Sequence, residues 1–483
     1  MAYPLRDSTL LGNANASEGV NEKSDYYREP ELSIIETQEF DEKFYHASGV
    51  DSASSTNSPK SEHGIRANGP RLWHDLHHTA QWGAIPGSMG MARLTLSDED
   101  KAVRDWFVKE ARSFGCQIKI DGIGNIFAVL PGRNNDLAPI AMGSHLDTQP
   151  AGGRFDGILG VLSGLEVLRT IKESGELTYA PIAVVVWTNE EGARFNPGCT
   201  GSAVWAGWTR LSDALKQTDS EGASIESELS RIGYAGPYLA DHRMNPLSAH
   251  FELHIEQGPR LEKASKQIGV VCGVQGIRWY TAKVTGERAH AGSTPMSVRS
   301  DAVVGAAEII TLLRDRATEL NGFATVGCVH VDRASSNTIA GDVTFSIDLR
   351  HRSAEGLEAM ERNMRDRMEA LTLRSPGLHF SLAQRWESPA VRFDDSMLSC
   401  VRAAASNELG VYGFIELDSN AGHDSVLTAA CGVPSAMIFV PSKAGLSHCP
   451  EEFTSEEDCT VGVQVLLDSV LRYDDAVREY LSR

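Results

Sequence analysis

Short apolar runs alternate with a helical repeat along the middle of the chain and predict an α/β architecture. Residues 125–130, 139–143 and 181–188 are apolar runs bounded by turn residues. Between the second and third runs, apolar residues recur at helical spacing, at Ile158, Leu162, Leu165, Leu168 and Ile171. The order strand, helix, strand with continuously apolar strands is typical of a mostly parallel sheet covered on both faces by helices.

A different pattern occupies residues 276–388. Strands are predicted at 277–284, 324–331, 342–350 and 379–385, and helices at 303–313 and 357–371. This βαββαβ order is that of a ferredoxin-like domain. A helix near 400–409 and a strand at 435–440 then resume the first pattern. We therefore predict one domain formed by residues 71–275 and 389–483, interrupted by an inserted domain of residues 276–388.

Residues 1–70 are rich in Ser, Asn, Glu and Asp and contain few clustered apolar residues. Such a segment cannot bury enough surface to offset the entropy of ordering it, so we predict a disordered acidic tail. The whole chain of 483 residues is long enough for two further domains.

The charge balance and the cysteines narrow the class of protein. A formal net charge of −20 argues against nucleic acid as a partner, because phosphate binding needs a basic face. An anionic ligand would have to be attracted by a few local cations or by metals. The sequence contains no run of eighteen apolar residues, so no membrane span is predicted. Eight scattered cysteines without a C-x-x-C pair indicate neither a zinc ribbon nor a disulfide framework and fit the cytoplasm.

Histidines and acids follow the predicted strands, where a parallel sheet places its ligand-binding groups. His145 and Asp147 come just after the run at 139–143, and Asp156 lies at the start of the next helix. Asp156 could instead cap that helix, because aspartate accepts the free N–H groups there and complements the helix dipole. Three nearby glycines indicate a backbone that turns tightly around something.

Two adjacent acids, Glu190 and Glu191, end the most apolar predicted strand. Neighbouring carboxylates repel each other and lose hydration unless a cation or a proton compensates; a solvated loop is the alternative. His254 lies on a strand-like segment and His448 in a loop near the C-terminus. One histidine alone is more often structural than a ligand, but three histidines with several acids after strands favour a metal site.

A site with two metals explains these residue types. It needs a carboxylate that bridges the ions, imidazoles and carboxylates as outer ligands, and a free acid that takes a proton from a shared water. The metals lower the pKa of such a water from about 15.7 to about 7. The sequence contains no G-x-S-x-G elbow, Walker loop or intact G-x-G-x-x-G, so neither a serine nucleophile nor a nucleotide-binding loop is indicated.

Three segments together resemble one metallopeptidase family. They are residues 143–150 (Gly-Ser-His-Leu-Asp-Thr-Gln-Pro), 152–157 and 187–195. In this order they resemble the N-carbamoyl-L-amino-acid hydrolase and β-ureidopropionase (β-alanine synthase) branch of the M20 metallopeptidase family, over about residues 71–480. The resemblance implies that the larger domain is a di-metal catalytic domain and the inserted one a ferredoxin-like lid and dimerisation domain.

The resemblance also implies roles in the larger domain. The implied metal ligands are His145, Asp156, Glu191, His254 and His448. His145 and Glu191 would bind different metals, with Asp156 between them. Asp147 would orient His145, and Glu190 would be the general base and proton shuttle. Neighbouring residues of an extended strand point in opposite directions, so the chain must bend at Glu190 and Glu191.

The resemblance also implies which residues would contact the substrate. In relatives, the residue corresponding to His290 reaches the active site of the other subunit and polarises the scissile carbonyl, which implies a homodimer. Asn337 and Arg350 resemble positions that hold the substrate carboxylate. The planar guanidinium of Arg350 suits that task, although a surface strand arginine is the alternative. Gln257 would form a hydrogen bond with the substrate.

We therefore expect a metal-dependent amidohydrolase that acts on a small molecule. It would cleave the N-carbamoyl group of N-carbamoyl-β-alanine, a step of pyrimidine catabolism, or of N-carbamoyl-L-amino acids, releasing amino acid, ammonia and carbon dioxide. Two ions per subunit are expected, zinc first, with manganese or cobalt also suited to these ligands. The alternatives are an allantoate amidohydrolase, an M20 exopeptidase, and a catalytically retired interaction scaffold, against which the intact ligand set argues.

Overall fold

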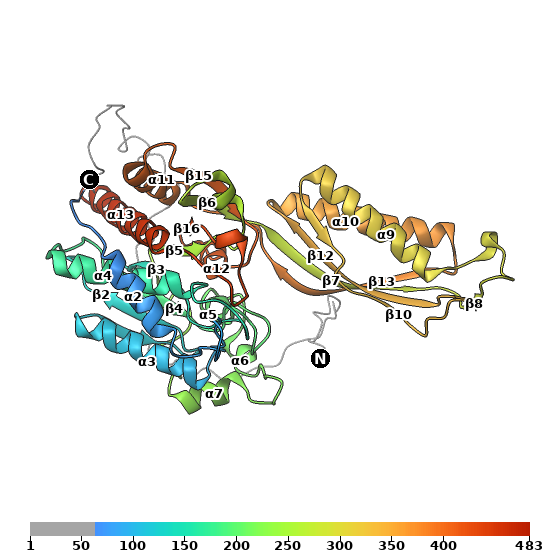
Figure 1. Ribbon diagram of the computed structural model, residues 1–483, viewed down its shortest axis with the longest axis horizontal. Helices are drawn as coiled ribbons and strands as arrows, with labels where there is room; N and C mark the ends of the chain where they lie inside the picture. Colours follow the sequence, from blue (N-terminus) through green and yellow to red (C-terminus); the bar gives the residue numbers. More distant parts are fainter. Residues whose placement is uncertain (1–62) are drawn as a thin grey trace, which may run out of the picture.

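The computed structural model describes residues 63–483, which form two units with separate sheets and hydrophobic cores (Figure 1). The larger unit contains residues 63–275 and 389–483, and the inserted unit contains residues 276–388. This is the predicted arrangement of an α/β domain with a second domain inserted into it.

The larger unit is built on a nine-stranded sheet with the order β1-β2-β4-β3-β5-β16-β6-β14, and β15 also pairs with β6. The central strands β4, β3, β5 and β16 are parallel, whereas β1, β2, β6 and β14 form the antiparallel pairs that flank them. The strands are β1 (Gln117–Ile120), β2 (Ile126–Leu130), β3 (Ile140–His145), β4 (Ile182–Trp187), β5 (Ala249–Ile255), β6 (Ile268–Val274), β14 (Val391–Arg392), β15 (Phe414–Ser419) and β16 (Ser435–Val440).

Both faces of the central strands are buried, which explains why β4 is wholly apolar and why β3 and β16 are mostly so. On β4, Ile182 and Val184 join the main core with the long helices, while Ala183 and Val185 join a second core around Trp205. The helices of this unit are α2 (Gly69–Thr79), α3 (Asp98–Ser113), α4 (Ile158–Ser174), α5 (Thr200–Trp205), α6 (Leu211–Ala214), α7 (Ile225–Ile232), α8 (Arg260–Ala264), α11 (Asp395–Leu409), α12 (Asp424–Ala430), η2 (Lys443–Gly445) and α13 (Glu456–Leu481).

The inserted unit has a smaller antiparallel sheet with the order β10-β12-β7-β13, and β9 also pairs with β12. Residues of β12 alternate between buried and half-buried, because one face of the sheet packs on the two long helices. The elements are β7 (Gly276–Thr285), β8 (Ala289–His290), η1 (Met296–Val298), α9 (Ala302–Leu320), β9 (Phe323–Thr325), β10 (Val329–Val331), β11 (Thr338–Ile339), β12 (Asp342–His351), α10 (Ala354–Arg374) and β13 (His379–Ser388).

One predicted strand of the inserted unit is wrong in detail. Residues 324–331 form two short strands, β9 and β10, instead of one. The pairing register with β12 shifts by one residue between them, so the intervening residues form a bulge that ends the first strand.

The predicted tail needs a correction at its C-terminal end. Residues 1–62 lie outside the described residues, but residues 63–70 pack on the larger unit. Ile65 is buried in the main core, and Gln464 forms hydrogen bonds with the main chain of Ile65 and Ala67. Helix α2 then begins at Gly69, with Asn68 as its N-cap. One apolar residue and main-chain bonds anchor this stretch, so it shows no periodic apolar pattern in the sequence.

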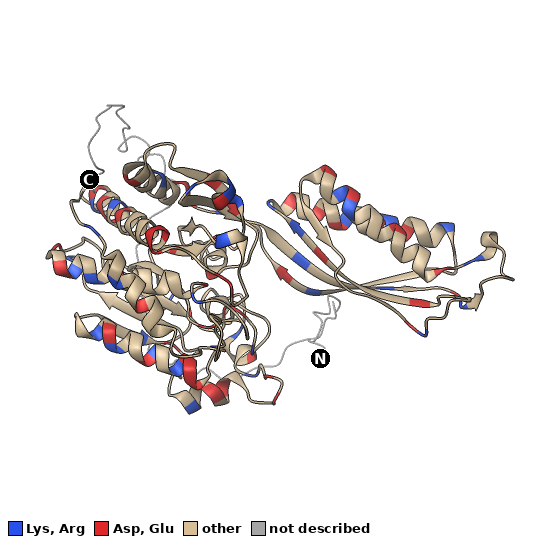
Figure 2. Cartoon of the chain, viewed as in Figure 1, with Lys and Arg blue, Asp and Glu red and all other residues tan. Residues whose placement is uncertain are grey.

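Acidic and basic residues are interspersed along the helices of both units (Figure 2). Among the helices formed by residues 63–483, none is long and apolar enough to cross a membrane.

Candidate metal centre

Three neighbouring strands of the larger sheet carry the predicted ligands to one edge. Strand β3 lies between β4 and β5 and is parallel to both, so the three carboxyl ends lie together. His145 is the last residue of β3, His254 is next to last in β5, and Glu191 follows β4. Their side chains are almost fully buried.

The five predicted ligands form two groups that share Asp156. One group is His145, Asp156 and His254, and the other is Asp156, Glu191 and His448. Within each group the nearest donor atoms all lie within 4.8 Å of one another. Each group could therefore hold one ion.

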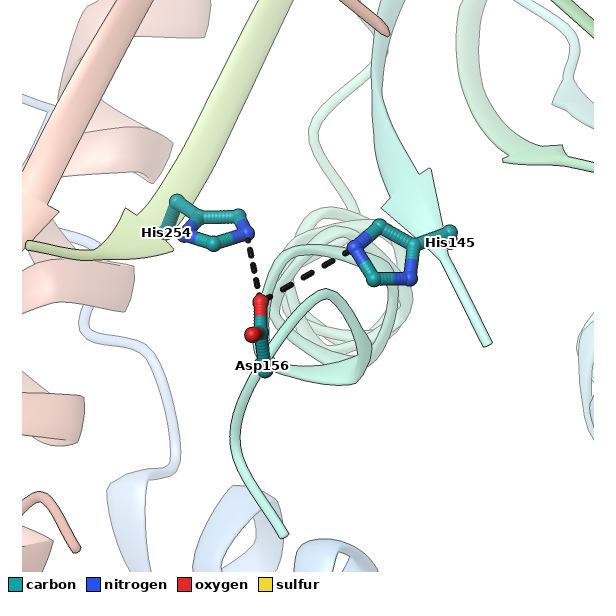
Figure 3. A group of neighbouring side chains, drawn as sticks. All are labelled: His145, Asp156 and His254. Atoms are coloured by element: carbon teal, nitrogen blue, oxygen red, sulfur yellow. Dashed lines mark ion pairs between the residues drawn. The ribbon is translucent and has the colours of Figure 1, made fainter. Parts of the chain in front are cut away.

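The two carboxylate oxygens of Asp156 face different imidazoles. Oδ1 lies 3.1 Å from Nε2 of His254 and 3.9 Å from Nε2 of His145 (Figure 3). Oδ2 lies 3.2 Å from Nε2 of His448. The alternative role as a helix cap is not observed, because the N-cap of α4 is Gly157 and no side chain caps it. Asp156 is thus placed as a bridging carboxylate would be.

The turn that carries Asp156 depends on close packing. Gly157 has a φ of +70°, and a Cβ at this position would lie 2.2 Å from Cε1 of His145, so only glycine fits. Oε1 of Glu452 accepts hydrogen bonds from the main-chain N–H groups of Phe155 and Asp156, both at 3.0 Å. The sequence-based prediction missed Glu452, which lies in an acidic stretch with no motif around it.

The chain bends at the two adjacent glutamates, as predicted. Asn189 has a φ of +59°, which ends the extended conformation of β4. Oε2 of Glu190 then lies 3.4 Å from Nε2 of His145, whereas Oε2 of Glu191 lies 3.4 Å from Nε2 of His448. The two carboxylates therefore face different metal-binding groups.

Asp147 has a different geometry from the predicted one. Its main-chain carbonyl, not its carboxylate, forms the hydrogen bond with Nδ1 of His145, at 2.9 Å. The carboxylate accepts hydrogen bonds from the main-chain N–H groups of Glu190 and Glu191, at 3.4 and 3.2 Å. The nearest carboxylate oxygen is 3.9 Å from Nδ1. The residue thus orients His145 through its main chain and holds the bend through its side chain.

Burial dominates the electrostatics of the acids. It raises the pKa of Asp147 to about 7 and that of Glu191 to about 8. Burial raises the pKa of Glu190 well above its usual value, and the charge of Asp424 adds to this. Burial opposes ionisation of Asp156 too, but hydrogen bonds from His254 and His448 hold its pKa well below the usual value.

The imidazoles respond to the same environment. Burial lowers the pKa of His145 to about 4. His254 is equally buried, but its contact with Asp156 outweighs burial and raises its pKa to about 9. The hydrogen bond with Asp156 raises the pKa of His448 to about 9. Without metal, the negative charge of Asp156 thus favours the protonated forms of His254 and His448.

The donor atoms fit divalent metal ions. Among residues 63–483, no lysine or arginine forms an ion pair with the carboxylates of Asp147, Asp156, Glu190 or Glu191. Buried carboxylates without a cation are costly, and imidazole nitrogen and carboxylate oxygen are ligands that zinc, manganese and cobalt accept. Two ions would supply the missing positive charge.

Two side chains near the centre, those of His423 and Cys199, were not predicted, and Gln257 has a different contact from the predicted one. His423 is buried, with its ring centroid 4.7 Å from that of His254. The thiol of Cys199 donates to Oε1 of Glu190 at 3.4 Å. Gln257 was predicted to bind substrate, but here its amide donates to Oδ2 of Asp156 at 2.8 Å. An adjacent His-Asp pair before a helix, at residues 423–424, was the available signal for His423.

The predicted substrate-binding residues of the inserted unit lie at two separate places. His290 pairs with Thr338, next to Asn337, at the tip of the inserted unit farthest from the larger sheet (Figure 1). Arg350 lies at the other end, where it pairs with Asp348 and donates to the main-chain carbonyl of Asn420 at 2.7 Å. The chain therefore does not bring His290 and Asn337 to its own metal centre in this conformation.

The sequence and the fold are similar to those of known proteins. The model of peptidase family M20/M25/M40 matches residues 141–472. The chain belongs to this family. An N-carbamoyl-L-amino-acid amidohydrolase from Rhizobium meliloti is 40% identical over 85% of this chain and 98% of its own length.

Two further similar proteins extend the comparison. The crystal structure of a hydantoinase/carbamoylase family amidase from Burkholderia multivorans has a TM-score of 0.78 and 43% identity over 84% of this chain and 98% of that one. An allantoate amidohydrolase from Bacillus subtilis is 32% identical over 80% of this chain and 94% of its own length. The fold and the hydrolase class are thus those of M20 amidohydrolases.

Proposed function

We propose that this M20 hydrolase removes the N-carbamoyl group from N-carbamoyl amino acids, releasing the amino acid, ammonia and carbon dioxide. The observation that carries the proposal is the position of Asp156, whose two oxygens face two different sets of donor atoms. Similarity to an N-carbamoyl-L-amino-acid amidohydrolase supports the choice of substrate.

Five residues would hold two divalent ions per subunit: His145, Asp156, Glu191, His254 and His448. Zinc is the first candidate, and manganese and cobalt suit the same ligands. When bound, the ions would polarise the carbamoyl carbonyl and acidify the attacking water. Asp147 would keep His145 and the two glutamates in place through the bonds described above.

Glu190 is the candidate general base. It belongs to neither three-residue metal group, yet its carboxylate lies 3.4 Å from His145. A buried carboxylate of raised pKa accepts a proton from water readily and can return it to the leaving nitrogen. Gln257 and the thiol of Cys199 would limit the motion of the reacting groups.

The inserted units of both subunits of a homodimer would contribute residues that bind one substrate molecule. Arg350 would hold the substrate carboxylate from the same chain. His290 and Asn337 would come from the partner chain of a homodimer, where His290 stabilises the oxygen of the scissile carbonyl. The placement of these two residues at the distal tip supports a partner role, because they lie far from their own metal centre (Figure 1).

The proposal also includes a cellular compartment and a metabolic role. The eight cysteines are all free, which suits a reducing cytoplasm. If N-carbamoyl-β-alanine is the substrate, the enzyme would act in pyrimidine catabolism.

A substrate panel tests the proposal. The metal-loaded protein would be assayed for amino-acid release from N-carbamoyl-α-amino acids, N-carbamoyl-β-alanine, allantoate and dipeptides. We expect the carbamoyl compounds to have the highest kcat/KM. Preference for allantoate would favour the activity named for the Bacillus subtilis relative, and preference for dipeptides would make the protein an exopeptidase.

A further inference from the structure

A pocket of about 230 Å³ lies beside the metal centre, where the inserted unit joins the larger one. We name it the hinge pocket and define it by Cys199, Trp208, Trp386, His423, Val426 and Leu427. Trp386 belongs to β13, close to the point where this strand returns to the larger unit, and the other five residues belong to the larger unit. A pocket next to the connection should change little when the inserted unit moves.

Two residues in the wall of the hinge pocket contact the groups that we expect to react. Cys199 in its wall donates to Glu190, and the ring of His423 in its wall contacts His254. Gly422 also lines the pocket, two residues beyond Asn420, whose carbonyl accepts the hydrogen bond from Arg350. The wall of the pocket therefore includes residues that contact the metal centre and a residue close in sequence to the partner of Arg350, the cation that we expect to bind the substrate carboxylate.

The chemistry of the wall favours an apolar group. Two tryptophans, a valine and a leucine contribute apolar surface, and Trp208 is 56% exposed. The only acidic or basic side chain in the wall is that of Glu387, apart from the imidazole of His423. Arg278 and Gln384 already satisfy this carboxylate, at 2.9 and 2.8 Å. An exposed apolar patch in a concave site is typical of a binding surface.

The size of the pocket restricts its occupant to part of a ligand. Sites that enclose a whole small molecule usually measure roughly 300–1,000 Å³. The hinge pocket is smaller and would hold one substituent while the reacting bond lies at the metals. On an N-carbamoyl-α-amino acid, the side chain is the substituent that remains once the carbamoyl group and carboxylate are placed.

We propose that the hinge pocket receives the side chain of the substrate, so the enzyme prefers N-carbamoyl-α-amino acids with apolar side chains. This inference rests on the proposed function, because it assumes a carbamoyl substrate. N-carbamoyl-β-alanine would leave the pocket empty. An acidic side chain would lose hydration there without gaining a cation.

The test compares substrates that differ in the side chain alone. For the metal-loaded full chain, kcat/KM for N-carbamoyl-L-leucine should exceed that for N-carbamoylglycine at least about tenfold, the size expected for a hydrophobic pocket. N-carbamoyl-L-aspartate and N-carbamoyl-β-alanine should rank with or below the glycine compound. Equal values for leucine and glycine, or a preference for aspartate or β-alanine, would overturn the inference but leave the proposed function standing. Hydrolysis of no carbamoyl compound would overturn both.

Two variants locate the preference in the hinge pocket. Trp208→Ala removes apolar wall and should lower the leucine-to-glycine ratio about tenfold. Thr209→Phe, at a half-buried lining position, should fill the pocket and lower the same ratio. Tyr412→Ala is the matched control, because Tyr412 is an exposed aromatic residue outside the pocket. An unchanged ratio in both pocket variants, with the fold intact by circular dichroism, would place the side chain elsewhere.

Discussion

The two units differ in how they assemble the predicted functional residues. In the larger unit, residues up to about 300 positions apart in sequence converge on Asp156 within hydrogen-bonding distance. In the inserted unit, Arg350 lies against the larger unit, whereas His290 and Asn337 lie at the distal tip. The candidate metal ligands thus lie together within one chain. The predicted substrate-binding residues of the inserted unit do not.

The difference follows from sheet topology. Parallel strands bring their carboxyl ends to one edge, so residues that follow β3, β4 and β5 must meet there. The antiparallel strand β12 instead carries Arg350 near one end, while the short strands β8 and β11 lie beyond its other end. Under the proposed function, a substrate that contacts both ends of this unit would therefore draw on a second copy of the chain.

Removing the proposed general base, Glu190, should have the largest effect. Glu190→Gln keeps the size of the side chain but cannot accept the proton, so kcat should fall by about 10³, within the usual range for acid–base catalysis. Steady-state kinetics would be measured together with metal content. Glu408→Gln, which alters an ion pair with Arg66 away from the centre, serves as the control. Unchanged kcat in the Glu190 variant would contradict the assignment.

Exchange of subunits tests whether His290 acts across a dimer. His290→Ala should lower kcat about 10²-fold, the size expected for loss of one donor to the oxyanion. An equal mixture of His290→Ala and Glu190→Gln chains, re-dimerised, should recover roughly a quarter of wild-type activity, because half the dimers then contain one intact site. Activity would be measured on the mixture, after mass spectrometry has verified its heterodimer content. No recovery would mean that His290 acts within its own subunit or not at all.

Unlike His290, Arg350 should bind the substrate at the metal centre of its own chain. Arg350→Lys keeps the charge but loses the planar pair of donors, so KM should rise about 10-fold with a smaller change in kcat. Kinetics on the best carbamoyl substrate would be compared with Arg365→Lys, which alters an arginine on α10 that pairs with Glu361. Equal KM values in the two variants would remove Arg350 from the substrate site.

A smaller effect is expected on the free energy of unfolding, from His250, one of two buried histidines of β5. His254 faces Asp156, whereas the ring of His250 forms hydrogen bonds with Trp187 and Ser425, and burial lowers its pKa to about 3. The unfolded chain therefore binds this proton first, and stability is lost as the pH falls below about 6.5. Between pH 6.5 and 5 the loss should be about 2 kcal/mol.

Urea denaturation of the metal-free protein would measure this loss. His250→Gln lacks the titrating group, so its free energy of unfolding should fall less than that of the wild type over the same pH range. Parallel pH profiles for the two proteins would show that His250 does not carry the effect.

The sequence predicted those parts of the fold and site that depend on local patterns. The apolar segment of β4 and the helical spacing of α4 were recognised because burial requires them. His145, Asp156 and Glu191 were recognised because their motifs are contiguous. Glu452 and Cys199 were not, because they reach the centre through tertiary packing without a local signal. The role of the Asp147 main chain was also hidden, since any residue type supplies a carbonyl.

Metal titration tests whether the centre around Asp156 is a two-metal hydrolytic site. The metal-free protein would be titrated with zinc, manganese or cobalt while amino-acid release from an N-carbamoyl amino acid is measured. We expect no activity without metal and a plateau at two ions per subunit, lost in Asp156→Asn. Full activity after verified removal of all metal would contradict the account.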